Sequence, residues 1–211
     1  MESYLTLRAA CEAVGEFVDR KSRVIAQVVH VESEQDAAAH IAAVRSRHHD
    51  ARHNVPAWIL EDGSERASDD GEPQRTSGMP TLEVLRGAGM RDVCCVTTRY
   101  FGGTLLGPGG LVRAYTAAAQ SALDTAREQG LIVEMTEVVP VRLTMDYASY
   151  DRVSYLAGIS NGKVAGTAYT DEVALELVFR AGEERAFTDQ VAEGFAGRVS
   201  VTAEPARFAE F

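Results

Sequence analysis

Three carboxylates lie close together between Ala67 and Pro80, and they are the residues best suited to acid–base or metal chemistry. Asp69, Asp70 and Glu72 stand among the glycines and prolines of a long loop. Such a cluster can hold Mg²⁺ or act as a general base. Carboxylates beside turn glycines also accept hydrogen bonds from backbone N–H groups, or pair with an arginine. The sequence leaves both interpretations open.

A histidine shortly before this loop could supply the acid or base of such a site. His48, His49 and His53 lie close together, but no HExxH motif or Cys/His grid accompanies them. A solvent-exposed helix end is therefore favoured over a metal site, and neither a metal nor a cofactor is expected. One enzyme hypothesis remains, a small phosphate-handling enzyme in which His53 moves a proton while the three carboxylates hold a metal ion.

The second candidate site is a glycine-rich loop, Gly102–Gly110, between a β-branched, apolar run that begins at Val93 and a long alanine-rich segment. Backbone N–H groups at a helix start attract anions. The loop is no Walker motif, because Pro108 and Gly109 stand where Lys and Ser/Thr are required. Basic and aromatic residues near it could contact phosphates or stack on a base. The candidate nucleic-acid or anion-binding residues are Lys21, Arg23, His53, Arg99, Tyr100, Phe101, Gly102, Gly103, Gly109, Gly110 and Arg113.

The same residues have a purely structural interpretation. Arg99 could form an ion pair with Asp70 or Glu72, which would then be supporting carboxylates, and Tyr100 and Phe101 could fill the core. Perturbed ion pairs are structural as readily as functional, so residue types alone do not decide between the two interpretations.

Composition limits the function classes. The formal net charge is −10, with 14 basic and 19 acidic residues in 1–136 and 7 basic and 12 acidic residues in 137–211. This acidity disfavours strong sequence-independent binding of nucleic acid, although a local basic patch remains compatible with it. Cys11, Cys94 and Cys95 form neither a disulfide framework nor a CxxC pair. With no apolar run of membrane-spanning length, the sequence predicts a soluble cytoplasmic protein.

Periodicity predicts two α+β domains, 1–136 and 137–211. The first has strands at 4–7, at 16–31 (two strands joined near Lys21), at 56–60 and from 93, with helices at 34–48, 80–87 and 110–128. The second has the order strand, helix, strand, strand, helix, strand, at 138–145, 150–157, 161–169, 173–180, 183–195 and 198–203. That order is the ferredoxin-like βαββαβ unit, a module suited to binding or dimerisation. The oligomeric state is not predicted.

Three motifs together resemble the Impact/YigZ family. They are Lys21–Ala26, the loop from Asp69 to Pro80, and Thr98–Gly103 continued by Gly109–Tyr115. The resemblance implies an N-terminal β-α-β domain of the kind found in a small-subunit ribosomal protein and in elongation factor G, followed by a ferredoxin-like module. Eukaryotic members regulate translation, and bacterial members have a suspected link to nucleic acid, ribosomes or translation. The main functional hypothesis is therefore a cytosolic, non-enzymatic regulator that binds RNA, the ribosome or a translation-associated protein.

The chain departs from the family pattern at two places near the candidate sites. Gln74 and Arg75 occupy positions where many members carry a small residue followed by glycine, so a different loop shape is expected there. Leu105 stands in the glycine loop where many members carry a lysine, which removes one phosphate contact.

Overall fold

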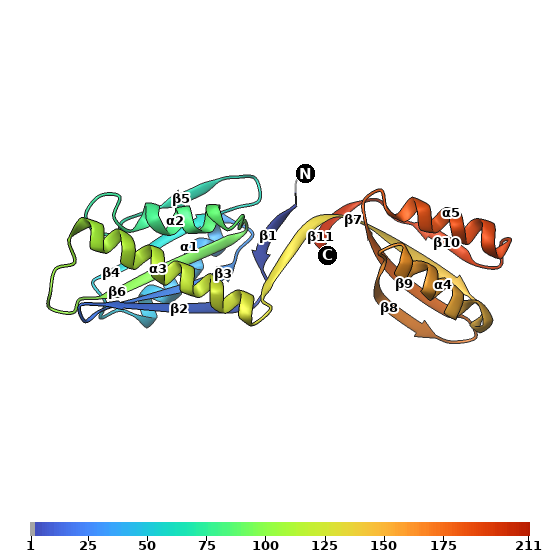
Figure 1. The fold of residues 1–211 in the computed structure, drawn as a ribbon, viewed down its shortest axis with the longest axis horizontal. Coiled ribbons are helices and arrows are strands. Elements are labelled where there is room, and N and C mark those ends of the chain that lie inside the picture. The colour runs from blue at the N-terminus through green and yellow to red at the C-terminus, as the bar shows by residue number, and fades with distance from the viewer. Residues whose placement is uncertain (1–2) are drawn as a thin grey trace. The chain divides into compact units, whose positions relative to one another are not determined.

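A computed structural model describes residues 3–211, which form two compact units (Figure 1). The first unit is Tyr4–Val133, and the second is Glu134–Phe211 together with Ser3. The domain boundary expected near residue 136 falls inside one long strand, β7 (Ile132–Met145). Each unit has its own hydrophobic core.

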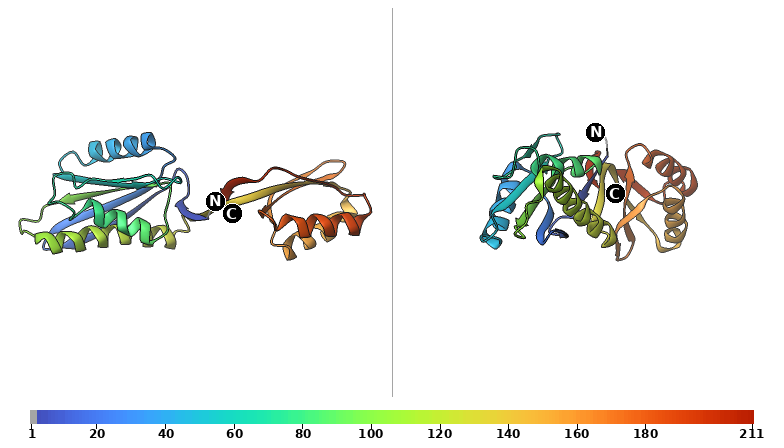
Figure 2. Two further views of the ribbon diagram at one scale, coloured as in Figure 1. Left: turned by 90° about the horizontal axis from the view of Figure 1, so that it is seen from above. Right: turned by 60° about the vertical axis from the view of Figure 1, so that its left-hand side comes forward.

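The first unit contains a five-stranded antiparallel sheet with helices packed on both of its faces. Its strand order is β2-β3-β6-β4-β5, and β1 lies outside that order. Helices α2 and α3 cover one face and α1 the other (Figure 2). The elements are β1 (Tyr4–Leu7), β2 (Glu12–Asp19), β3 (Ser22–His30), α1 (Glu34–Arg47), β4 (His53–Ile59), β5 (Glu65–Ala67), α2 (Gly78–Gly87), β6 (Val93–Tyr100) and α3 (Gly107–Glu128).

Helix α3 packs directly on the backbone of β2 at Gly15. A Cβ atom at this position would lie 2.1 Å from the backbone nitrogen of Ala122, so only glycine permits the contact. The face of α3 toward the sheet is made mostly of alanine, which lets the helix approach closely. This contact holds the second half of α3 against the sheet, and the helix begins several turns earlier, at Gly107.

Strands β2 and β3 are joined by a two-residue turn, Arg20–Lys21, with Asp19 paired to Ser22. Both turn residues have positive φ, 47° and 65°. The turn touches the glycine loop at Gly102, where a Cβ atom would lie 2.1 Å from the carbonyl carbon of Lys21. The N–H of Gly102 also donates to Ser22 Oγ at 3.1 Å.

Pro56 lies inside a paired strand, although proline is usually confined to strand edges or to positions outside the ladder. It aligns with Val96 of β6, while β5 pairs with the following residues on the other side of β4. Its carbonyl accepts a bond from the N–H of Ser68, away from β6. Because N and C=O of one strand residue point the same way in an antiparallel ladder, the ring nitrogen also points away from β6 and costs no bond to that strand.

The second unit has the predicted ferredoxin-like fold. Its antiparallel strand order is β10-β7-β9-β8, with α4 and α5 packed on one face of the sheet. One additional strand, β11, pairs with the first half of β7. No helix in residues 3–211 is long and apolar enough to cross a membrane. Besides β7, the elements are α4 (Tyr147–Ile159), β8 (Lys163–Tyr169), β9 (Val173–Arg180), α5 (Glu184–Phe195), β10 (Ser200–Ala203) and β11 (Arg207–Glu210).

Candidate functional site

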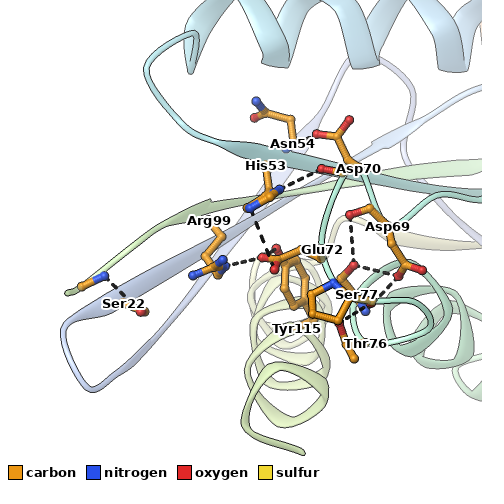
Figure 3. A network of polar contacts seen from close by, with 12 residues as sticks. Ser22, His53, Asn54, Asp69, Asp70, Glu72, Thr76, Ser77, Arg99 and Tyr115 are labelled. Carbon is orange, nitrogen blue, oxygen red and sulfur yellow. Dashed lines mark hydrogen bonds and ion pairs between the residues drawn. The ribbon is translucent and has the colours of Figure 1, made fainter. Parts of the chain in front are cut away.

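A buried polar cluster lies beneath the glycine loop, and Glu72 is its centre (Figure 3). The Glu72 side chain is 3% exposed, and its Oε1 accepts bonds from Arg99 Nε and, at 2.8 Å, from the Tyr115 hydroxyl. His53 Nε2 lies 3.9 Å from Glu72 Oε2, too far for a hydrogen bond. Four elements meet here: the loop before α2, the end of β6, α3 and the start of β4.

Burial and charge fix the protonation of two of these groups. Burial, followed by the neighbouring Glu72, raises the pKa of Tyr115 far above its ordinary value, so its hydroxyl remains a hydrogen-bond donor. Burial alone would lower the pKa of Arg99, but the bond and the charge of Glu72 outweigh it and raise that pKa. Arg99 and Glu72 are thus a buried ion pair with no net charge.

His53 is held in one orientation by the backbone. Its Nδ1 lies 2.8 Å from the carbonyl oxygen of Asp70. A carbonyl oxygen only accepts, so Nδ1 carries the hydrogen, and Nε2 is the nitrogen that faces Glu72. The His53 side chain is 9% exposed, so it lies below the surface of the first unit.

Asp69 caps the start of α2. Its carboxylate accepts bonds from the backbone N–H groups of Arg75 at 2.7 Å, Ser77 at 3.1 Å and Gly78 at 2.9 Å, and from the Ser77 hydroxyl at 2.8 Å. Burial on its own would raise the pKa of Asp69, but these bonds prevail and lower it. Asp69 therefore does the structural work of a helix cap.

The other two carboxylates point elsewhere. Asp70 accepts from the N–H of Asn54 at 2.7 Å and from Arg45 at 2.8 Å, whereas Glu72 points inward to Arg99. Within residues 3–211 no group of three or more His, Cys, Asp or Glu side chains could hold a metal ion. The three carboxylates of the acidic cluster thus bind different partners, although the carbonyl oxygen of Asp70 contacts His53, the neighbour of Glu72 (Figure 3).

A cavity of about 280 Å³ lies against the buried ion pair, and we call it the glycine-loop cavity. Phe101 and Leu105 stand on its rim with 51% and 80% of their surfaces exposed. Helix α3 begins at the cavity without a side-chain cap, and Gly109 and Gly110 lie in its first turn. The remaining lining residues are Glu72, Pro73, Arg99, Leu106, Gly107, Pro108 and Leu111.

Two candidate arginines form ion pairs at the surface. Arg23 binds both carboxylate oxygens of Glu16 at 2.8 Å, and Arg113 binds Asp19 at 2.7 Å. The arginine side chains are 53% and 65% exposed. Exposed pairs of this kind contribute only about 0–1 kcal/mol, so a phosphate can replace the carboxylate at little cost.

The β2–β3 turn adds two cations beside the loop. Arg20 donates to the carbonyl oxygen of Leu105 at 3.3 Å, and Lys21 is exposed next to Gly102. Gly103, with φ of 88°, is exposed in the same loop. The structure therefore brings the turn and the glycine loop into one surface.

Tyr100 does not belong to this surface. Its hydroxyl lies 2.9 Å from His48 Nδ1 and donates to Asp50 at 3.1 Å, so the side chain lies at the end of α1. Neighbouring strand residues point to opposite faces, which separates Tyr100 from Phe101. Neither fills the core, because Tyr100 is half-buried and Phe101 is largely exposed.

The sequence argument missed Tyr115 as a member of the polar cluster. Tyr115 follows Leu111 by four residues on the buried face of α3, among alanines. A buried tyrosine hydroxyl needs a hydrogen-bond partner, and this was the signal available in the sequence. Which acidic residue accepts the bond depends on the path of a loop distant in the chain.

Comparisons with known proteins match both units of the chain to one family of relatives. The model of the Impact N-terminal domain matches residues 20–123, and that of a domain of unknown function, DUF1949, matches residues 143–198. The chain is 34% identical to IMPACT family member YigZ of Escherichia coli, covering 96% of this chain and 98% of the relative. It is 33% identical to IMPACT family member YvyE of Bacillus subtilis, covering 92% and 87%. A crystal structure described only as a hypothetical protein superposes with a TM-score of 0.58 at 32% identity, covering 97% and 98%.

Proposed function

The chain belongs to the IMPACT family, and from this premise we propose that it is a non-enzymatic regulator of translation that binds RNA, free or within the ribosome. The proposed contact surface is the glycine loop together with the β2–β3 turn. The observation that carries the proposal is the packing of Gly102 on Lys21 and Ser22, which joins these two segments.

The charges around this contact support an RNA surface. Arg20, Lys21, Arg23 and Arg113 gather here with two acidic partners, Glu16 and Asp19, although the whole chain carries a net charge of −10. Cations position an RNA through its phosphates, and exposed aromatic rings such as Phe101 stack on bases. The uncapped first turn of α3 adds backbone N–H groups for a phosphate.

The phosphate-handling enzyme has less support. That hypothesis needs Asp69, Asp70 and Glu72 around one metal ion, and each of them is engaged elsewhere. A translation-associated protein is the second candidate partner, since the exposed Phe101 and Leu105 also suit an apolar protein contact.

Fluorescence anisotropy with a labelled single-stranded RNA, measured over a series of KCl concentrations, tests the proposal. Lys21→Ala and Arg113→Ala should each weaken binding and lower the slope of log K against log[salt] by about 0.7, the value for one lost phosphate contact on a single strand. The matched control is Arg66→Ala, which removes an exposed arginine from β5 at the opposite edge of the sheet.

Two outcomes would overturn the proposal. One is an affinity without salt dependence, and the other is equal binding by Lys21→Ala, Arg113→Ala and Arg66→Ala. A partner that pulls down with the chain from lysate after nuclease treatment, and is lost with Leu105→Ser, would favour the protein candidate instead.

A further inference from the structure

We propose that the glycine-loop cavity is a subsite for one unstacked guanine base. The inference rests on the proposed function, because it assumes that RNA reaches this surface. It adds what the surface cations cannot provide, namely recognition of a particular base.

The size of the cavity suits a single base. Pockets for drug-sized ligands measure about 300–1,000 Å³, and this cavity, at about 280 Å³, lies just below that range. It can therefore take one ring system but not a whole nucleotide with its sugar and phosphate. Pro73, Leu106 and Leu111 give it apolar walls, which match the faces of a base.

The polar part of the cavity carries no net charge and so does not select a phosphate. Arg99 is 9% exposed, and its Nε–H is donated to Glu72. An arginine has five N–H donors, so most of the guanidinium remains for a ligand in the cavity that it lines. Glu72 Oε2 accepts no hydrogen bond from any residue in 3–211, and His53 is its neighbour at 3.9 Å.

A donor beside an acceptor is what the Watson–Crick edge of guanine requires. Guanine presents the O6 acceptor next to two donors, N1–H and N2–H. Arg99 can donate to O6 while Oε2 of Glu72 accepts from the adjacent N1–H and N2–H, and bonds to charged partners are the stronger kind (Figure 3). Uracil offers a single N–H there, and adenine and cytosine have an amino group with ring acceptors.

The surroundings can hold the rest of the nucleotide. Phe101 forms part of the cavity rim and is about half exposed, and the centre of its ring lies 5.9 Å from the Arg99 guanidinium carbon. Stacking of a base on an aromatic ring contributes about 1–3 kcal/mol by alanine substitution. The first turn of α3 begins at the same cavity and offers N–H groups to the adjoining phosphate.

The test uses the full chain and short adenosine oligonucleotides whose central position is guanine, adenine, uracil, cytosine or an abasic ribose. Anisotropy should show the guanine oligonucleotide binding about tenfold more tightly than the abasic one, with the other bases in between. Free guanosine is titrated in parallel by NMR, with the Arg99 Nε–H and Gly103 N–H signals as readouts.

Three variants separate stacking from edge recognition. Phe101→Ala should remove most of the gain from any base, and Phe101→Trp should restore it. Glu72→Gln should abolish the preference for guanine, with a thermal melt confirming that it is folded. Tyr155→Ala is the control for loss of an exposed aromatic ring, since Tyr155 is 67% exposed in the second unit.

The outcomes distinguish the subsite from the proposed function. Salt-dependent RNA binding with equal affinity for the guanine and abasic oligonucleotides overturns the subsite and leaves RNA binding in place. A guanosine response at Arg99 without measurable RNA binding supports the subsite and overturns the proposed function. Absence of both responses overturns both.

Discussion

Substitution of Gly102 by alanine should destabilise the first unit by about 2–4 kcal/mol. The added Cβ would lie 2.1 Å from the carbonyl carbon of Lys21 and 2.2 Å from the nitrogen of Ser22. Carbon atoms in contact are ~3.5–4.0 Å apart, so the two backbone segments must separate by more than about 1 Å. Overpacking of this kind costs about 1–3 kcal/mol. Loss of the Gly102–Ser22 hydrogen bond adds about 1 kcal/mol.

The assay is urea unfolding followed by tryptophan fluorescence. The chain has one tryptophan, Trp58, which is 5% exposed in β4, so its emission reports on the first unit alone. The matched variant is Gly109→Ala, where a Cβ would meet no atom within 4 Å. Alanine is the better residue inside a helix by up to about 1 kcal/mol, so Gly109→Ala should be as stable as the parent chain or slightly more stable.

The stabilities of the two glycine variants show whether the contact between Gly102 and Lys21 matters. If Gly102→Ala unfolds within about 0.5 kcal/mol of the parent chain, the turn and the loop are not held together as described, since surface changes typically stay within that limit. Equal destabilisation by both variants would instead show that glycine flexibility in the loop matters, and not the contact with Lys21.

Three further predictions concern Tyr115, Asp69 and the two buried cysteines of the first unit. Tyr115→Phe leaves one bond to the buried Glu72 unmade and should cost about 1–3 kcal/mol in the Trp58 assay; an unchanged urea midpoint would contradict the cluster. Asp69→Ala removes the α2 cap and should cost about 0.5–2 kcal/mol at neutral pH. Because the folded pKa of Asp69 is lowered, its stabilisation is present above the unfolded value of about 3.9 and is lost as pH falls through the folded pKa, so the two unfolding curves should converge in acid; a constant gap would be evidence against the ionised cap. Burial raises the pKa of Cys95 to about 12 and that of Cys94 well above its ordinary value, so a thiol reagent at mildly alkaline pH should modify neither until urea is added. Rapid modification of either in the native chain would show that this core opens.

Local sequence signals predicted the ferredoxin-like order and most of the elements, but not the short strands β5 and β11. Alternating apolar residues, glycine stops and Pro108 near the start of α3 are read within a window of a few residues. Helix α1 begins with a cap of the same local kind, since the Ser33 side chain accepts the N–H of Asp36. Such features need no knowledge of distant parts of the chain.

Local sequence signals could not predict which carboxylate pairs with Arg99. Asp70 and Glu72 are two residues apart, and the side that each faces is set by the backbone between them. Asp70 and Gly71 both have positive φ, 46° and 83°, which reverses the chain and turns Glu72 inward. A left-handed aspartate is uncommon enough that composition does not predict it.

Arg75, which departs from the family pattern described above, also has a left-handed backbone conformation. Arg75 has φ of 62°, which glycine adopts freely and other residues adopt at a cost of about 1–2 kcal/mol. The chain therefore has a left-handed residue at the position where the family resemblance led us to expect glycine. This one substitution does not by itself require a different backbone path.

The Arg20–Lys21 turn has a consequence for engineering. A two-residue hairpin with both φ values positive favours asparagine followed by glycine, and this chain instead places two long cationic side chains there. A designer who optimised stability alone would combine Arg20→Asn with Lys21→Gly, and would gain a better turn while deleting two charges from the glycine-loop surface. The most stable turn and the most positively charged surface thus require different residues at positions 20 and 21. Such a conflict between stability and function is common in natural proteins.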